Sequence, residues 1–276
     1  MQNDVPPRVG LRTEEELLRR IAERGPALVA LSGGVDSSLV AALAREALGP
    51  SSVAVTLAGP AVARSEVERA RRVARAIGID HVVLEVDPLA RAEYRANTPN
   101  RCYFCRTVET EALRREGRGR GIAQYLDGVH SDDLTEERPG LRAMDEAGFD
   151  HPLAWAGWGK PIVRSVARRR RLPNWDQPSD ACLSSRVRHG EPISPELLAR
   201  IEEGERWLLG RGFRRVRVRA HGGAARVEVD PEEVARLSAE PLASELRAAL
   251  TGLGFAPVDI DPAGYGGGKG SGGARG

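Results

Sequence analysis

The chain has 276 residues, with 41 lysines and arginines against 39 aspartates and glutamates, for a formal net charge of +2. At roughly 100–200 residues per domain, this length predicts two domains, or one large domain with an appendage. Hydrophobic residues make up 41% and charged residues 29%, which excludes a chain disordered throughout. This near-neutral net charge does not indicate a nucleic-acid partner, so any binding of an anion must depend on a local group of residues.

The sequence contains no run of ~20 apolar residues such as a membrane-spanning helix needs, and its first ten residues lack the basic-then-apolar plan of a secretory signal. We therefore expect a cytoplasmic protein without a membrane partner. Its three cysteines are an odd number, which disfavours a disulfide framework. In a reducing compartment, they are expected to be metal ligands, a reactive thiol or inert core residues.

Strand-like and helix-like segments alternate through the first half of the chain. This alternation predicts right-handed βαβ crossovers and a parallel sheet covered on both faces. The expected elements, in chain order, are a helix at Thr13–Arg24, a strand at Ala27–Leu31, a helix at Ser38–Leu48, a strand at Val53–Leu57, a helix at Ser65–Ile77, a strand at His81–Val86, a helix at Val108–Glu116, a strand at Ile122–Leu126 and a helix at Lys160–Arg171.

The pattern changes after the irregular segment 172–190. We predict an α/β fold, with a Rossmann-like parallel-sheet domain at residues 1–190 and a smaller α+β domain at residues 191–261. Residues 262–276 are rich in glycine and are predicted to be disordered. The elements expected in the smaller domain are a helix at Pro195–Leu209, strands at Val216–Arg219 and Ala225–Val229, and a helix at Pro231–Leu237 that continues to Leu250.

A glycine-rich motif, SGGVDS at residues 32–37, lies between a predicted strand and a predicted helix. Glycines let backbone N–H groups approach an anion closely, and the N-terminus of a helix carries partial positive charge. The spacing matches neither the Walker A loop nor G-x-G-x-x-G. The motif predicts a phosphate cradle, with an ordinary tight turn as the alternative. Asp127 ends a strand at the carboxyl edge of the sheet, where ligands of open α/β sheets bind. The predicted nucleotide-binding residues are Ser32, Gly33, Gly34, Asp36, Ser37 and Asp127.

The cysteines form the second motif. Cys102 and Cys105 stand in a C-x-x-C pair, and two thiolates at this spacing can hold one metal or one cluster edge. Cys182 lies in a polar segment and could complete three ligands. Three thiolates are one short of a closed tetrahedral zinc site, so either a histidine is the fourth ligand or one position stays open. A buried pair of small side chains is the alternative for the C-x-x-C pair.

Several motifs together resemble one family. In chain order they are SGGVDSSLVAAL, TPNRCYFC, LDGVHSDD, RPGLRA, LPNWDQPSDACLSSR and RVRVRAHGGAARVEV. The first resembles the loop of the PP-loop ATP pyrophosphatases, and the whole set, covering about residues 20–250, is similar to the LarE sulfur-insertase family of that superfamily. The resemblance implies a PP-loop domain at residues 1–190, ATP as a bound nucleotide, and Mg²⁺ held near the phosphates by Asp36.

The resemblance also implies the chemistry. LarE enzymes adenylate a carboxylate of pyridinium-3,5-biscarboxylic acid mononucleotide and replace its oxygen with sulfur, for biosynthesis of the nickel-pincer nucleotide cofactor. In some members the counterpart of Cys182 gives up its own sulfur and becomes dehydroalanine. In members that also have the C-x-x-C pair, three thiolates are expected to hold a [4Fe–4S] cluster. This chain has Cys102, Cys105 and Cys182 but no fourth cysteine, so one iron of such a cluster would lack a protein thiolate. The chain thus departs from the sacrificial pattern, and two sulfur sources stay open: Cys182 itself, or a sulfide that the open iron binds and hands to the adenylate.

The predicted substrate-binding residues lie late in the chain. Arg186 follows Ser185 and matches the family's substrate-loop arginine, where a guanidinium suits a carboxylate or phosphate. Glu205 matches a substrate-site carboxylate of the family. Arg217 and Arg219 alternate along a predicted strand, so their side chains fall on one face. A solvated glutamate and a solvated basic strand are the alternatives for these last three residues.

We predict an ATP-dependent sulfur transferase in which Asp36 and Cys182 are the catalytic residues. The expected partners are a small mononucleotide substrate and further copies of the chain, with no nucleic acid. The loop 100–105 and the segment 172–190 are expected to close over one pocket that shields the adenylate from water. The alternatives are a tRNA thiolation enzyme of the same superfamily and a non-catalytic protein that binds a nucleotide or senses a metal.

Overall fold

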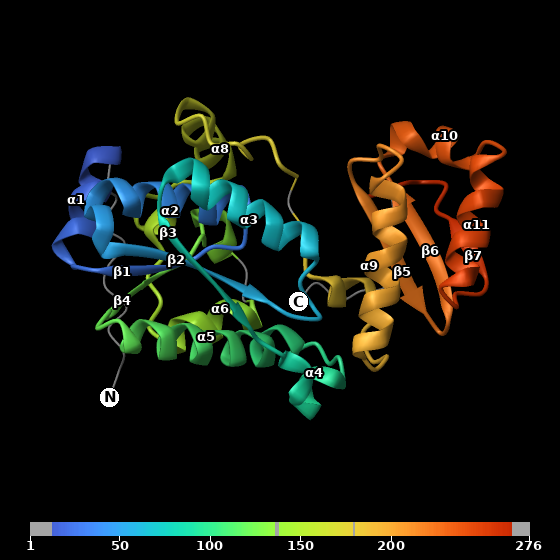
Figure 1. Cartoon of the computed structure of the whole chain (residues 1–276), viewed down its shortest axis with the longest axis horizontal. Helices are drawn as coiled ribbons and strands as arrows, with labels where there is room; N and C mark the ends of the chain where they lie inside the picture. The colour runs from blue at the N-terminus through green and yellow to red at the C-terminus, as the bar shows by residue number, and fades with distance from the viewer. Residues whose placement is uncertain (1–12, 136–137, 179, 267–276) are drawn as a thin grey trace. The chain divides into compact units, whose positions relative to one another are not determined.

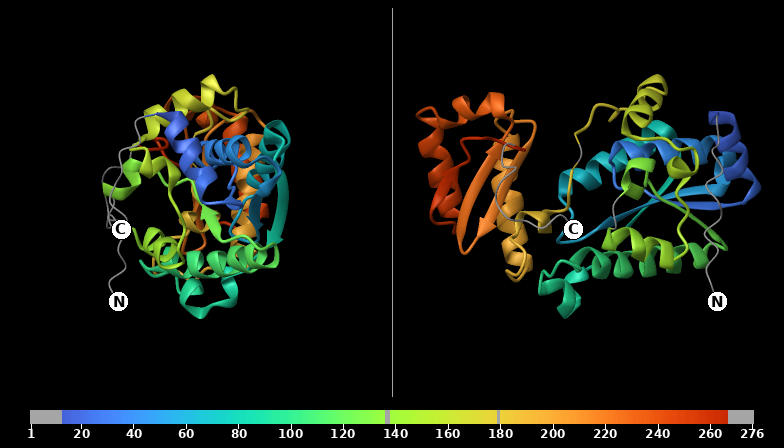
Figure 2. Two further views of the ribbon diagram at one scale, coloured as in Figure 1. Left: turned by 90° about the vertical axis from the view of Figure 1, so that its left-hand side faces the viewer. Right: turned by 180° about the vertical axis from the view of Figure 1, so that it is seen from behind.

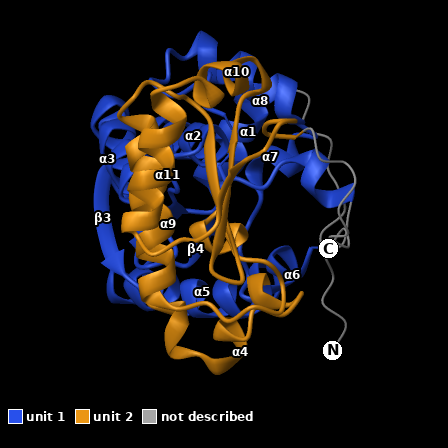
Figure 3. Ribbon diagram, turned by 90° about the vertical axis from the view of Figure 1, so that its right-hand side faces the viewer, with its two compact units in different colours: residues 1–86, 103–180 blue, residues 87–102, 181–276 orange. Residues whose placement is uncertain are grey.

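A computed structural model of the chain describes residues 13–135, 138–178 and 180–266. By their internal contacts, these residues form two compact units (Figure 3). Unit 1 comprises residues 1–86 and 103–180, and unit 2 comprises residues 87–102 and 181–276. The segment 87–102 therefore contacts the C-terminal part of the chain, whereas the predicted boundary at residue 190 placed it in the first domain.

Unit 1 contains a four-stranded parallel sheet with strand order β3-β2-β1-β4. Figure 1 shows α1, α2 and α3 on one face of this sheet and α5 and α6 on the other. The predicted α/β fold with a parallel sheet is thus confirmed. The strands are β1 (Ala27–Ala30), β2 (Ser52–Ala58), β3 (Asp80–Glu85) and β4 (Gln124–Leu126), and the helices are α1 (Glu14–Glu23), α2 (Val35–Leu48), α3 (Arg64–Ile77), α5 (Arg101–Gly119), α6 (Pro139–Glu146), α7 (Pro152–Trp155) and α8 (Lys160–Arg169).

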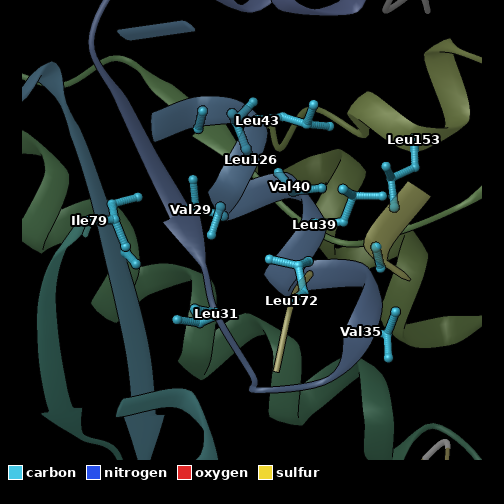
Figure 4. Packing of buried hydrophobic residues seen from close by; sticks show 14 of the residues in the cluster. Val29, Leu31, Val35, Leu39, Val40, Leu43, Ile79, Leu126, Leu153 and Leu172 are labelled. Carbon is cyan, nitrogen blue, oxygen red and sulfur yellow. The ribbon is translucent and has the colours of Figure 1, made fainter. Parts of the chain in front are cut away.

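Each face of this sheet has its own hydrophobic core, because successive side chains of a strand point to opposite faces. Val29 and Leu31 belong to the core that includes α1, α2 and α8, and Figure 4 shows them beside Leu39 and Leu126. The core of the other face includes Leu28 of β1, with partners on β2, α5 and α6. A strand buried on both faces fixes the position of the loop that follows it.

Unit 2 contains a three-stranded sheet in the order β5-β6-β7, with β5 and β6 antiparallel (Figure 2). Gly204 lets α9 pack closely, since a Cβ there would lie 2.9 Å from Leu250 of α11 and 3.2 Å from Val218 of β5. The elements are α4 (Ala92–Arg95), α9 (Pro195–Leu209), β5 (Val216–His221), β6 (Ala224–Val229), α10 (Val234–Ser238), α11 (Leu242–Gly252) and β7 (Val258–Ile260), with a 3₁₀ turn at Leu183–Arg186.

Three predicted elements need correction. The expected loop 100–105 is helical, because α5 begins at Arg101 rather than at Val108. The helix expected from Pro231 to Leu250 is a 3₁₀ turn followed by α10 and α11. Its break coincides with Pro241, which lacks the backbone N–H that a continuous helix needs. The third correction is to α2, which begins at Val35 rather than Ser38, so half of the glycine-rich motif is helical.

Within the described ranges, no helix is both long enough and apolar enough to span a bilayer. Of the predicted C-terminal tail, residues 267–276 lie outside the described part of the chain. Residues 262–266 are described, and the backbone N–H of Tyr265 donates to the carbonyl of Val229 at 2.7 Å.

Candidate functional site

The predicted phosphate cradle lies where β1 ends and α2 begins. The Ser32 N–H donates to the Ser37 hydroxyl at 3.2 Å, and the two hydroxyl oxygens are 3.0 Å apart. The Ser38 hydroxyl donates to the Gly34 carbonyl at 2.7 Å. These bonds fold the motif into a closed loop whose later residues form the first turn of α2. The N–H groups of that turn have no partner within the helix, so the loop is suited to bind an anion.

Gly33 is a glycine for two physical reasons. Its φ of +80° is in the left-handed region, which L side chains rarely adopt. A Cβ at this position would also lie 2.9 Å from the backbone nitrogen of Ala70 and 2.9 Å from the backbone oxygen of Glu66. The backbone of α3 therefore fits closely against the loop.

Asp36 is paired with Lys160, a residue that the sequence motifs did not identify as functional. The Lys160 ammonium lies 2.7 Å from one carboxylate oxygen of Asp36 and 2.5 Å from the other. Both side chains are partly exposed, at 27% for Lys160 and 24% for Asp36. Lys160 begins α8, and its N–H donates to Asp132 at 2.8 Å. Asp36 thus faces an ammonium group at the N-terminus of α2.

Asn174 ties the irregular segment after α8 to the same loop. Its side-chain amide donates to the Gly33 carbonyl at 2.8 Å and to the Ser38 hydroxyl at 2.9 Å. Asn174 is 5% exposed, so these bonds are shielded from water. A second tie lies in the same segment, where Arg69 of α3 pairs with Asp180 at 3.0 Å. The segment is therefore fixed to the glycine-rich loop within unit 1.

Asp127 follows β4, and its neighbour Gly128 packs against the start of α2. A Cβ on Gly128 would lie 2.6 Å from the backbone nitrogen of Ser37. One carboxylate oxygen of Asp127 accepts from the Val129 N–H at 2.9 Å and contacts Nδ1 of His151 at 2.8 Å. The other oxygen is buried and has no hydrogen-bond partner among the described residues. That oxygen could receive a proton donor or a cation of a ligand.

His151 reaches Asp127 because the segment after α6 pairs with β4 at the edge of the sheet. Asp150 pairs with Leu126 in a parallel bridge, and its N–H donates to the Tyr125 carbonyl at 2.8 Å. Nε2 of His151 contacts a carboxylate oxygen of Asp145 at 2.8 Å. Burial disfavours the charged imidazole, but the hydrogen bonds that the imidazolium donates to two carboxylates outweigh it and raise the pKa of His151 to about 10. At neutral pH, His151 is a cation between two anions.

A second constellation lies in unit 2, around the 3₁₀ turn that follows Cys182. Arg186 contacts both carboxylate oxygens of Glu205, at 2.8 Å through Nε and at 3.0 Å through Nη2. Nη1 of Arg186 donates to the Cys182 carbonyl at 2.9 Å and to the Ser185 hydroxyl at 3.1 Å. The backbone N–H of Val218 donates to Glu205 at 3.1 Å. Four predicted site residues are therefore joined by hydrogen bonds.

The two predicted strand arginines lie on β5, as expected. Arg219 is paired with Glu228 of β6, and its Nη1 is 3.4 Å from the Ser185 carbonyl. Arg217 is 4% exposed and lies over the ring of Tyr265, with its guanidinium carbon 5.1 Å from the ring centroid. The arginines therefore differ in accessibility, since the side chain of Arg219 is 41% exposed.

The segment 87–102 supports the Cys182 turn from its other side. The Ser184 hydroxyl is 2.5 Å from the Tyr94 hydroxyl, and the Ser184 carbonyl accepts from Arg101 at 3.0 Å. Arg101 also donates to the Asn97 side chain at 2.6 Å. Because Arg101 directly precedes Cys102, these contacts hold the backbone next to Cys102 at the turn after Cys182 within unit 2.

The three cysteines are divided between the two units, with Cys105 in unit 1 and Cys102 and Cys182 in unit 2. Cys102 is exposed on the first turn of α5, and Cys105 is partly buried one turn later, with its sulfur 3.1 Å from Glu109. Cys182 is partly buried and precedes the 3₁₀ turn. Over residues 13–135, 138–178 and 180–266, no three His, Cys, Asp or Glu side chains gather as they would around a metal ion.

The sequence motifs missed three polar residues of these sites: Lys160, Asn174 and His151. Lys160 lies 124 positions from Asp36 and Asn174 lies 141 positions from Gly33, so no local spacing connects these pairs. His151 lies 24 positions from Asp127 and 6 from Asp145, but it belongs to none of the motifs. For Asn174, its place in the motif LPNWDQPSDACLSSR was a signal, but the motif did not indicate which residue the side chain contacts.

Comparison with known proteins identifies relatives along most of the chain. Residues 12–103 match the family model described as asparagine synthase. The chain is 38% identical over 255 residues to an uncharacterized protein of Synechocystis, covering 92% of this chain and 95% of the relative. It is 30% identical over 242 residues to pyridinium-3,5-bisthiocarboxylic acid mononucleotide synthase of Lactiplantibacillus plantarum, covering 87% of each chain. A tRNA-specific 2-thiouridylase of Caulobacter is 30% identical over 234 residues, covering 66% of this chain and 57% of that enzyme.

The His151 ion pairs predict a pH-dependent stability. The raised pKa of about 10 means that the stabilisation is fully present below the unfolded value of about 6.5 and is lost as the pH rises through 10. We expect His151→Gln to lower the free energy of unfolding by about 3 kcal/mol at pH 6, because it leaves a buried carboxylate without its cation. Urea unfolding at pH 6 and pH 10 measures this effect. A deficit of equal size at both pH values would contradict the assignment.

Proposed function

Since the chain belongs to the LarE family of sulfur-inserting PP-loop enzymes, we propose that it adenylates a carboxylate of pyridinium-3,5-biscarboxylic acid mononucleotide and converts it to a thiocarboxylate. The product would be a precursor of the nickel-pincer nucleotide cofactor. Membership of the family supports ATP-dependent sulfur transfer, and the proposal adds the substrate and the residues that act on it.

One observation carries the proposal. The turn that follows Cys182 is joined by hydrogen bonds to Ser185, Arg186 and Glu205, which the sequence predicted to form a substrate site. Arg219 contacts the same turn through the Ser185 carbonyl. A thiol beside clustered polar groups in a part-buried turn suits a nucleophile that attacks an activated carbonyl.

For adenylation, we propose that the triphosphate lies against the N–H groups of the glycine-rich loop and the first turn of α2. Mg²⁺, when bound, would neutralise the phosphates, and Asp36 would hold it. Since Lys160 contacts both oxygens of Asp36, its ammonium would move from that carboxylate to a phosphate oxygen when the cation arrives. An oxygen of the substrate carboxylate attacks the α-phosphorus, the bond to the β-phosphate oxygen breaks, and pyrophosphate leaves.

For sulfur insertion, the adenylate makes AMP the leaving group. The Cys182 thiolate attacks the carbonyl carbon, and the bond to the AMP oxygen breaks. Loss of the Cα proton and cleavage of the Cβ–S bond would then release the thiocarboxylate and leave dehydroalanine. These steps are redox-neutral and consume one Cys182 sulfur per product.

The predicted [4Fe–4S] cluster is not used in these steps. Of its three proposed ligands, Cys105 belongs to unit 1, whereas Cys102 and Cys182 belong to unit 2. The cluster therefore stays a prediction from the resemblance, as do the homo-oligomer and the cytoplasmic location. Iron and sulfide analysis after anaerobic purification tests the cluster directly, with Cys102→Ala and Cys105→Ala as the variants that should lose both.

The tRNA thiolation alternative is less well supported. The Caulobacter tRNA 2-thiouridylase matches over only 57% of its own length. The net charge of +2 also gives no global attraction to RNA.

Removal of the Asp36 carboxylate tests the nucleotide site. We expect Asp36→Ala to abolish release of pyrophosphate from ATP while leaving the far-UV circular dichroism spectrum unchanged, because the metal-holding group is lost and the helix remains. Asp259→Ala is the matched control, since Asp259 is an exposed residue of β7. An unchanged pyrophosphate rate in the Asp36 variant would refute the assignment.

The Lys160 ammonium is tested by two substitutions. We expect Lys160→Met to slow pyrophosphate release by about 10- to 100-fold, which corresponds to the loss of one charge-assisted hydrogen bond of roughly 1.5–3 kcal/mol. Lys160→Arg keeps the positive charge and should retain more of the rate. Equal rates in the methionine variant and the unmodified enzyme would show that Lys160 pairs only with Asp36.

The source of sulfur is tested by intact mass. After reaction with ATP and substrate in the absence of iron, we expect the protein to lose the mass of one H₂S, with dehydroalanine at residue 182. The same reaction after reconstitution with iron and sulfide tests for an external sulfur source. Repeated turnover with an intact Cys182 would show that the sulfur does not come from this residue.

A further inference from the structure

Arg186 is buried deeply for a residue that is expected to bind a substrate. Its side chain is 3% exposed, and that of its partner Glu205 is 8% exposed. A substrate carboxylate or phosphate would have to displace Glu205 to reach the fork of this guanidinium. That exchange would leave a buried carboxylate without its cation, which is strongly unfavourable.

The contacts of Arg186 point to the backbone of its own turn. On one edge, Nε and Nη2 contact the two oxygens of Glu205, in the bidentate geometry that suits a guanidinium and a carboxylate. On the other edge, Nη1 donates to the carbonyl of Cys182 at 2.9 Å and also to the carbonyl of Ala181. One side chain thus binds the peptide groups on both sides of the Cys182 α-carbon.

Glu205 is itself fixed in place. It lies on α9, and its Oε1 accepts from the Val218 N–H of β5 at 3.1 Å. The segment after Arg186 is held by the same strand, because Val187 pairs with Ala220 in a parallel bridge. The carboxylate therefore holds the guanidinium at a fixed position relative to α9 and β5.

We infer that Arg186, oriented by Glu205, is a positioning residue that holds the Cys182 backbone and aims its thiol, rather than a ligand of the substrate. This inference takes the identity of the reaction from the proposed function, whereas the contacts of Arg186 come from the structure alone. Lysine cannot replace arginine here, because one ammonium cannot contact two carboxylate oxygens and two carbonyls in a planar arrangement.

The test compares Arg186→Lys with Arg188→Lys, a matched control at an exposed arginine two residues later. We expect Arg186→Lys to speed hydrogen exchange of the Ser185 and Val187 amides by about tenfold or more, since both amides are bonded within this turn. It should lower the maximal single-turnover rate of thiocarboxylate formation by tenfold or more, and change the mononucleotide concentration that gives half of this rate by less than about threefold. The control should change none of these values.

A substrate ligand would behave differently. A tenfold rise in the mononucleotide concentration that gives half of the maximal single-turnover rate, with amide exchange as in the unmodified protein, would overturn the inference. Glu205→Gln provides a second variant if Arg186→Lys does not fold, because glutamine keeps the size of the side chain and an acceptor for Val218. It should shift the maximal single-turnover rate and the exchange in the same direction, and unchanged values would also overturn the inference.

The measurements separate this inference from the proposed function. If the unmodified protein forms no thiocarboxylate from the mononucleotide and ATP, the proposed function fails. The exchange rates in Arg186→Lys and Glu205→Gln still decide whether the pair holds the Cys182 turn, and unchanged rates there would overturn the positioning role.

Discussion

The structure of unit 1 depends on the parallel pairing of β1 with β2 on one side and β4 on the other. Parallel strands in register bring their carboxyl ends to one edge, so the loop after β1 and Asp127 after β4 lie at the same edge although they are about ninety residues apart. The close approach of Gly128 to Ser37 is a direct consequence. A sheet slipped by one residue would turn every side chain of β1 to the wrong core and separate these groups.

Charged groups named at both sites form ion pairs with groups of opposite charge. Lys160 faces Asp36, His151 lies between Asp127 and Asp145, and Arg186 faces Glu205. Partly buried and buried charges are costly alone, so each partnership lowers the cost of keeping an ion where chemistry needs it. The side chains of the Lys160–Asp36 pair are partly exposed, whereas those of the Arg186–Glu205 pair are buried. A ligand would therefore reach the first pair more readily than the second.

The sequence predicted what depends on local pattern. The strands, most helices and the glycine-rich loop follow from periodicity and turn residues, and the alternation of elements predicted the parallel sheet. The partners of the site residues did not follow, because Lys160 is 124 positions from Asp36 and Asn174 is 141 positions from Gly33. The start of α5 was missed for a similar reason. Arg101 has its contacts in Asn97 and Ser184, and the latter lies 83 residues further along the chain.

The near-neutral net charge of the chain is matched at the two sites by ion pairs, in each of which a cation faces a carboxylate. A bound anion leaves the net charge of a site unchanged if it takes the place of a carboxylate or arrives with a cation. In the proposed mechanism Lys160 exchanges Asp36 for a phosphate, and its side chain is 27% exposed, while that of Arg219, which pairs with Glu228, is 41% exposed. Arg186, at 3%, cannot make that exchange without leaving Glu205 buried and unpaired. Exposure of the cation thus divides the arginines and lysines of these sites into those that can bind ligands and those that hold the protein's own backbone.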